Sequence, residues 1–148
     1  MSAFSEADRR DLAQALIPIS RAAGAEILRF YRTDLDVDRK DDHSPLTEAD
    51  RASDAVIVPA LRALTPDIPI VSEEQVADDI SGGVFWLVDP LDGTKEFIAQ
   101  RDEFTVNIAL VEGDQPILGL VDPTSRGAIW TISSRASRWR IISPPAAP

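Results

Sequence analysis

The segment from Phe104 to Leu110 constrains the fold more than any other part of the sequence, because its side chains alternate with a period of two. Large apolar residues are separated by smaller or polar ones, which is the pattern of a half-buried β-strand. A turn signal at 112–115 and an apolar segment at 117–121 predict the antiparallel partner of this strand. Shorter apolar segments predict three further strands, at residues 68–72, 84–88 and 127–132.

The N-terminal part of the sequence has a helical period instead. Apolar residues recur every three or four positions from Leu12 to Phe30, which predicts an amphipathic helix over about residues 5–32. Pro18 lies inside this helix, where its missing N–H is expected to kink the helix or to start a new segment. The polar stretch 33–44 predicts a loop.

A second helix is expected to begin at Thr47. Asp50 follows three residues later and resembles the second half of a capping box, with Asp in place of the usual Glu. Pro59 predicts a distortion within this helix, and the segment 65–67 ends it. Two helices followed by an antiparallel meander predict an α+β fold, in which two long helices pack on a mostly antiparallel sheet.

The length of 148 residues suffices for one hydrophobic core. Apolar residues make up 44% and charged residues 27%, as in ordinary globular domains. No Asp or Glu follows Asp122, whereas four Arg do, and the chain ends in Ser-Pro-Pro-Ala-Ala-Pro. This change predicts a domain over residues 1–132 and an irregular tail over residues 133–148.

Charge and cysteine content argue against several function classes. A net charge of −10 argues against a nucleic-acid-binding surface, and the arginines from Arg126 to Arg140 are interpreted as a solvated stretch. The absence of Cys excludes disulfides and thiolate metal sites. No apolar run approaches the ~18 residues that cross a membrane, and residues 1–10 lack a secretory signal. We therefore expect a cytoplasmic protein, with peripheral attachment to the inner membrane face as the alternative.

The most informative motif is Trp-Leu-Val-Asp-Pro-Leu-Asp-Gly-Thr-Lys-Glu-Phe, at residues 86–97. Asp89 stands at the carboxyl end of a predicted buried strand, and Asp92 follows three residues later around a tight turn. Two carboxylates, with the Leu91 carbonyl between them, supply the oxygen ligands that Mg²⁺ prefers. A bound cation would also give an acidic protein the positive charge that phosphate binding requires.

Gly93 and Thr94 complete this motif. Gly93 lacks the side chain that would obstruct a phosphate near the backbone, and a helix starting here would direct N–H groups at phosphate oxygens. The Thr94 hydroxyl offers a group that orients a water. The alternative is an Asp-rich turn whose side chains cap a helix. This alternative would explain either Asp taken singly, but it does not explain the complete ordered motif.

Other acidic positions are weaker candidates. Glu73 and Glu74 follow the strand at 68–72. We expect Glu73 to be a metal ligand and Glu74 to be its supporting neighbour or a base. The alternative is that both side chains simply face water. Asp50, in the first turn of the second helix, either caps that helix or contributes to a further metal or the attacking water. His43 is the only histidine and receives no catalytic role.

The chain resembles the inositol monophosphatase superfamily from about residue 10 to residue 130. Four segments stand in the order seen in that family: Lys40…Ser-Pro-Leu-Thr-Glu-Ala-Asp50, Val71-Ser-Glu-Glu74, the string at 86–98, and Glu103-Phe-Thr-Val-Asn-Ile-Ala-Leu110. Lys95-Glu96-Phe97 is similar to the CysQ-type 3'(2'),5'-bisphosphate nucleotidases within it, because inositol monophosphatases proper usually have Thr-Asn-Phe there.

The resemblance implies a metal site with two or three Mg²⁺ ions. One ion would be held by Glu73, Asp89 and the Leu91 carbonyl. Asp89 and Asp92 would reach a second ion, and Asp50 would help to hold a third. The family also implies inhibition by Li⁺.

The same resemblance implies the reaction, hydrolysis of adenosine 3',5'-bisphosphate to AMP and phosphate, which recycles a by-product of sulfate assimilation. Thr94, with Glu73 or Glu74, would position the attacking water. The N–H groups of Gly93 and Thr94 would hold the phosphate, and Lys40 is assigned to substrate binding. An inositol monophosphatase-type sugar phosphatase remains an alternative.

The sequence departs from the family after about residue 130. The family continues into a second α/β domain with a Trp-Asp-x-Ala-Ala/Gly motif, whose Asp completes the second metal site, and this motif is absent here. A truncated product, half of a split enzyme, and a non-catalytic remnant that binds Mg²⁺ or phosphate would each explain the departure. A homodimer or a complementing C-terminal chain is therefore the expected partner, besides the phosphorylated small molecule.

Overall fold

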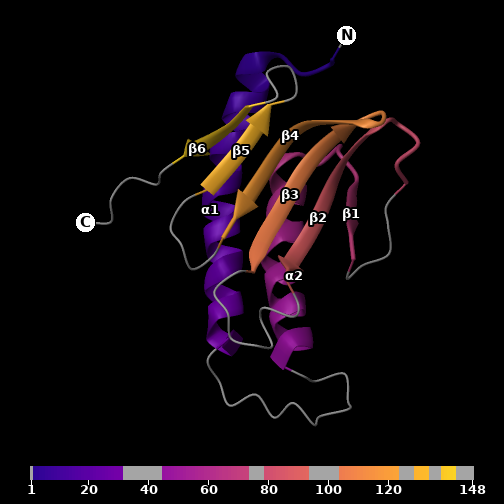
Figure 1. The fold of residues 1–148 in the computed structure, drawn as a ribbon. Helices are drawn as coiled ribbons and strands as arrows, with labels where there is room; N and C mark the ends of the chain where they lie inside the picture. The colour runs from indigo at the N-terminus through magenta and orange to yellow at the C-terminus, as the bar shows by residue number, and fades with distance from the viewer. Residues whose placement is uncertain are drawn as a thin grey trace.

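Two helices followed by six strands make up the described part of the chain, which in this computed structural model comprises residues 2–31, 45–73, 79–93, 104–123, 129–133 and 138–142. The helices are α1 (Glu6–Tyr31) and α2 (Pro45–Leu64). The strands are β1 (Ile70–Ser72), β2 (Val84–Asp92), β3 (Thr105–Glu112), β4 (Gln115–Asp122), β5 (Ile129–Ser133) and β6 (Arg138–Ile142). Figure 1 shows both helices on the same face of the sheet.

The strands form one sheet in the order of the sequence, from β1 to β6. β1 pairs with β2 in parallel, with Ile70 opposite Trp86, and every other neighbouring pair is antiparallel. The β3–β4 hairpin turns at Gly113, whose φ of 66° favours glycine. The predicted α+β architecture is confirmed.

The core lies between the sheet and the two helices. Leu16, Ala23 and Ile27 of α1, together with Ile57 and Leu61 of α2, are fully buried. The alternating apolar residues of β3 pack against them from the sheet. Trp86 is also fully buried, and its Nε1–H donates a hydrogen bond of 2.8 Å to Thr65 Oγ1, just beyond the end of α2. The period-two and helical patterns therefore identified the core-facing sides of these elements.

Both helices continue through their prolines, and the start of α2 differs from the prediction. α1 is a single helix that continues through Pro18, so no new segment begins there; the buried contacts of Leu16 and Ala23 hold both sides of the proline in place. α2 likewise extends through Pro59, and the distortion expected there stays a prediction. α2 begins at Pro45 rather than at Thr47, because proline is favourable at the first helical position, where no N–H partner is needed.

A reciprocal capping box does exist, at the start of α1. The Asp8 N–H donates to Ser5 Oγ at 3.0 Å, and the Ser5 N–H donates to Asp8 Oδ2 at 2.8 Å. The backbone hydrogen bond from Ser5 is the main reason that the pKa of Asp8 lies below its usual value. The position predicted for such a box, Thr47 with Asp50, was wrong, because Thr47 lies inside α2.

The irregular tail expected for residues 133–148 is wrong for its central part. β6 pairs with β5 in antiparallel register, with Trp130 opposite Ile141 and Ser133 opposite Arg138. The two strands are rich in Ile, Trp and Thr, which favour strands, but the interspersed Arg residues concealed this pattern. Residues 134–137 and 143–148 lie outside the described residues.

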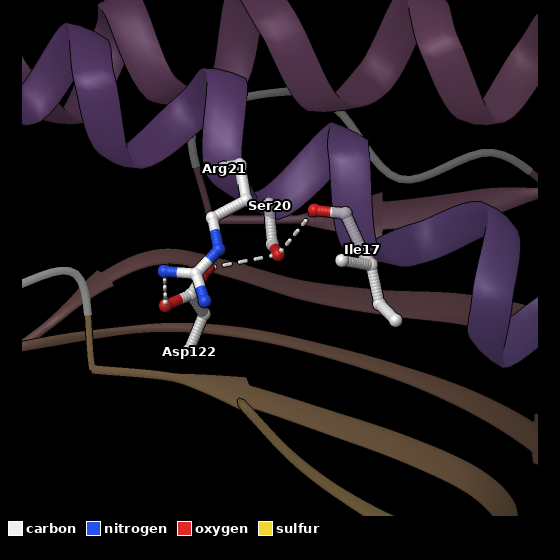
Figure 2. A network of polar contacts seen from close by, with 4 residues as sticks. All are labelled: Ile17, Ser20, Arg21 and Asp122. Atoms are coloured by element: carbon white, nitrogen blue, oxygen red, sulfur yellow. Dashed lines mark hydrogen bonds and ion pairs between the residues drawn. The ribbon is translucent and has the colours of Figure 1, made fainter. Parts of the chain in front are cut away.

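A buried polar contact joins α1 to the end of β4 (Figure 2). The Ser20 hydroxyl lies 2.9 Å from Asp122 Oδ2 and 3.0 Å from the Ile17 carbonyl oxygen. Arg21 Nη1 lies 3.7 Å from Asp122 Oδ1. Asp122 is only 1% exposed, and burial raises its pKa although Ser20 and Arg21 oppose that rise. This contact fixes α1 against β4 at a carboxylate that is costly to leave unpaired.

Replacing Ser20 by Ala should lower the free energy of unfolding by about 1–3 kcal/mol, because a buried carboxylate oxygen loses its hydroxyl donor. Urea unfolding of the two proteins measures the difference. Ser81→Ala, an exposed serine in a turn, is the matched control and should change stability by less than about 0.5 kcal/mol. Equal effects of the two substitutions would contradict the role of the Ser20 contact.

Candidate functional site

A β-bulge near the end of β2 organises the candidate site. Asp89 pairs with Asn107 of β3, and the pairing resumes with Asp92 opposite Thr105. Two residues of β2, Pro90 and Leu91, therefore oppose the one residue of β3 that lies between Asn107 and Thr105. In a regular strand, residues three apart point to opposite faces. The extra residue places both Asp89 and Asp92 on the same face.

Asp89 is half-buried, and its environment opposes its negative charge. Burial, the Glu73 carboxylate and the Asp92 carboxylate, in that order, raise its pKa to about 6, against a smaller opposing effect of the Leu91 N–H, which donates to it. Its Oδ1 atom is buried and accepts no hydrogen bond from any described residue. The site is therefore a place where positive charge would be strongly favoured.

Asp92 is exposed but is oriented by its neighbours on β3. Asn107 Nδ2 donates a hydrogen bond to Asp92 Oδ2 at 3.2 Å. Thr105 Oγ1 in turn donates to Asn107 Oδ1 at 3.0 Å, which fixes the orientation of the amide. Asn107 thereby leaves the second oxygen of Asp92 available on the same face as Asp89.

Glu73 approaches from the neighbouring strand. It lies in the turn directly after β1, and Ser72, the last residue of β1, pairs with Val88 in parallel register. Glu73 is therefore next to Asp89 across the sheet, and its charge raises the pKa of Asp89. Among the residues that the structure describes, however, no three acidic or histidine side chains are gathered closely enough to hold one ion together.

Asp50 and Gly93 flank this region. Asp50 is half-buried on α2, one turn before Ser53, whose hydroxyl donates to the Pro90 carbonyl in the bulge at 2.8 Å. Gly93 follows β2 with a φ of 101°, a conformation that other residues rarely adopt. The three remaining candidates, Lys40, Glu74 and Thr94, lie outside the described residues, as does His43.

Four residues that contact the strand ends of the candidate site were not predicted from the sequence. Ser53 and Asp54 of α2, Ser72 of β1 and Asn107 of β3 all contact the strand ends that carry the acidic residues. A signal for the first two was present: they are polar residues on the otherwise apolar stripe of α2, where a purely structural helix would carry apolar side chains.

The donor set suits a hard divalent cation. Carboxylate and backbone carbonyl oxygens are the ligands that Mg²⁺ accepts, and no nitrogen or sulfur donor is present among the described residues of this region. A divalent cation at this place would satisfy the buried Oδ1 of Asp89 and offset the negative charge that raises the pKa of its carboxyl group.

Leu-Val-Asp-Pro occurs twice in the sheet, at 87–90 in β2 and at 120–123 at the end of β4. Both strands are antiparallel to β3, so the two aspartates lie near the same end of the sheet. Asp89 is opposite Asn107, whereas Asp122 is opposite Val106. Successive residues of β3 face opposite ways, so Asp122 points toward the helices and Asp89 away from them.

No helix among the described residues is long and apolar enough to cross a membrane.

Comparison with known proteins shows which family this chain is similar to. The family described as "Inositol monophosphatase family" matches residues 8–138. The 3'(2'),5'-bisphosphate nucleotidase CysQ of Salmonella typhimurium is 50% identical over 111 residues, which cover 70% of this chain and 44% of that protein. The protein of the same name from Buchnera aphidicola is 40% identical over 117 residues, covering 76% of this chain and 44% of that protein.

Solved structures agree. CysQ from Bacteroides thetaiotaomicron, described as a bacterial member of the inositol monophosphatase family, superposes with a TM-score of 0.76 at 35% identity over 90% of this chain and 49% of that chain. An inositol monophosphatase from Zymomonas mobilis superposes with a TM-score of 0.78 at 29% identity over 97% of this chain and 53% of that chain. The chain thus spans about half the length of these relatives. From the residues matched and the shared fold, it belongs to the inositol monophosphatase family.

Proposed function

We propose that this chain forms the metal-holding part of a Mg²⁺-dependent phosphomonoesterase. The observation that carries the proposal is the half-buried carboxylate of Asp89, whose Oδ1 accepts no hydrogen bond from the described residues while Glu73 and Asp92 add negative charge beside it. A divalent cation would satisfy that oxygen and neutralise the repulsion.

The proposed ligands follow from the bulge. Glu73, Asp89 and the Leu91 carbonyl would hold one Mg²⁺ ion, and Asp89 and Asp92 would reach a second. Asp50, near the start of α2, would help to hold a third. All are oxygen donors. Inhibition by Li⁺ is expected if the proposed sites are formed.

Bound cations would supply positive charge that polarises the phosphoryl group and activates water. The residues of the chain would do the positioning. The N–H groups of Gly93 and Thr94 would donate to phosphate oxygens, and the left-handed φ of Gly93 directs the backbone at this point without a Cβ in the way. The Thr94 hydroxyl, with Glu73 or Glu74, would orient the attacking water, and Lys40 would attract the anionic substrate.

The proposed substrate is adenosine 3',5'-bisphosphate, which would yield AMP and phosphate and so recycle a by-product of sulfate assimilation. This choice is supported by relatives that carry the name 3'(2'),5'-bisphosphate nucleotidase at 50% and 40% identity. A second copy of the chain, or a separate chain equivalent to the remaining half of the relatives, would complete the site.

A second candidate is a module that binds Mg²⁺ or phosphate without turnover. It is favoured by one observation: within the described part of the chain, no three acidic side chains are already gathered around a single point. In this case Asp89 and Asp92 would still bind a cation, but water would not be held for attack.

Replacing Asp89 by Asn should weaken Mg²⁺ binding by more than about tenfold and reduce Mg²⁺-dependent phosphate release at least as strongly, because the central ligand loses its charge. Calorimetry measures binding, and phosphate release is followed with adenosine 3',5'-bisphosphate beside inositol 1-phosphate. Asp11→Asn, the same change at an exposed position of α1, is the control and should alter neither.

The outcomes separate the candidates. Release that depends on Asp89 supports the phosphatase, and the substrate ratio distinguishes the nucleotidase from a sugar phosphatase. Mg²⁺ binding that depends on Asp89 without release from either substrate supports the binding module. Unchanged Mg²⁺ affinity in Asp89→Asn would contradict both candidates.

Asp89 should also make the metal-free protein less stable as pH rises. Its pKa is about 6 in the folded chain and about 3.8 when unperturbed, so the folded state keeps the proton longer and ionisation opposes folding. Stability present below pH 4 is lost between about pH 4 and pH 6. As the pH rises from 4 to 7, the free energy of unfolding of Asp89→Asn should therefore increase relative to that of the parent by about 1–2 kcal/mol, after allowance for solvent screening.

Urea unfolding at each pH in the presence of a chelator measures this difference, with Asp11→Asn again as the control. Saturating Mg²⁺ should restore the stability of the parent at pH 7 and stabilise Asp89→Asn less. Parallel pH profiles for parent and Asp89→Asn would show that the charge of Asp89 is not opposed in the folded state.

A further inference from the structure

Two consecutive polar residues are buried on the core-facing stripe of α2. Ser53 is 0% exposed and Asp54 is 3% exposed, whereas this stripe otherwise carries apolar residues such as Ala49, Ile57 and Leu61. Burying a hydroxyl and a carboxylate costs free energy unless both form hydrogen bonds. Both side chains do so, and both partners belong to the sheet.

Ser53 contacts the bulge itself. Its hydroxyl donates a hydrogen bond of 2.8 Å to the carbonyl oxygen of Pro90. Pro90 is one of the two β2 residues that oppose a single residue of β3, so the regular ladder is interrupted at this point. The hydroxyl therefore provides a donor for a buried carbonyl where the sheet pairing is broken.

Asp54 contacts the neighbouring strand end. The Ser72 hydroxyl donates a hydrogen bond to Asp54 Oδ1, and both side chains are buried. Ser72 is the last residue of β1, and Glu73 follows it directly. One short segment of α2 thus holds two strand ends: the end of β1 that carries Glu73, and the bulge of β2 that lies between Asp89 and Asp92.

We propose that Ser53 and Asp54 are positioning residues that set the distance between Glu73 and the Asp89–Asp92 pair, by fixing both strand ends to adjacent residues of one helix. The inference rests on the proposed function in so far as these acids bind a cation. Neither residue would contact the cation; each would act through the strand end that presents a ligand. Residues in such supporting positions typically change metal affinity by about 10–100-fold when they are removed.

Ser53→Ala tests this role, with Ser20→Ala as the matched control. Both substitutions remove a fully buried hydroxyl from a helix that packs on the sheet, but Ser20 contacts Asp122 of β4 rather than the bulge. Two quantities are measured in the full chain: hydrogen exchange of the Leu91 amide without metal, and Mg²⁺ affinity by calorimetry. Global unfolding in urea provides the reference for the exchange.

Ser53→Ala should accelerate exchange of the Leu91 amide by about fivefold more than its effect on global unfolding explains, since one hydrogen bond of ordinary strength is lost locally. It should weaken Mg²⁺ binding by about tenfold. Ser20→Ala should accelerate Leu91 exchange no more than its global effect requires and should leave Mg²⁺ affinity unchanged. This contrast is the result that supports the proposal.

Equal effects of Ser53→Ala and Ser20→Ala on both quantities would overturn the proposal and reduce Ser53 to a packing residue. Ser72→Ala gives a second test at the other strand end, and it should weaken Mg²⁺ binding without accelerating Leu91 exchange. If the parent chain itself bound no Mg²⁺, the proposed function would fail, and the positioning role with it. That outcome differs visibly from a parent that binds Mg²⁺ and a Ser53→Ala variant that binds it equally well.

Discussion

The interruption of the β2–β3 ladder is the constraint on which the candidate site depends. In a regular ladder without the bulge, the spacing of three between Asp89 and Asp92 would send the two carboxylates to opposite faces of the sheet. With it, both lie on the face of Asn107 and Thr105, and the repulsion between them becomes a feature of the site. The bulge also disrupts regular pairing near a buried proline carbonyl, which is why a helix residue is needed behind it.

Buried serines connect both helices to the sheet in the same manner. Ser20 of α1 meets Asp122 at the end of β4, and Ser53 of α2 meets Pro90 in β2. Apolar packing between helices and sheet is non-directional and tolerates sliding, whereas a buried hydrogen bond is lost when its partners move apart. These contacts therefore fix the position of each helix along the strands, and the apolar core supplies most of the driving force for folding.

Much of the fold could be predicted because its signals are local. The alternation in β3 and the three-to-four spacing in α1 each reflect burial on one side of one element. The ligand candidates Asp89 and Asp92 were also evident in one short string. The unbroken course of α1 through Pro18, the pairing of β6 and the roles of Ser53 and Asp54 depend on contacts with residues distant in sequence. No periodicity within a single segment encodes such contacts, although a polar residue on an apolar stripe marks where one is needed.

The repeated Leu-Val-Asp-Pro segments show that the local sequence does not determine the environment of its aspartate. In β4 the aspartate of this segment, Asp122, contacts a serine and an arginine. In β2 the equivalent aspartate, Asp89, lies near two other carboxylates. What separates them is a single step along β3, from Val106 to Asn107. Loss or gain of one residue within either strand, ahead of its aspartate, would therefore exchange the buried face for the open one. For this sheet, a change in residue count is a more severe event than most changes in residue identity.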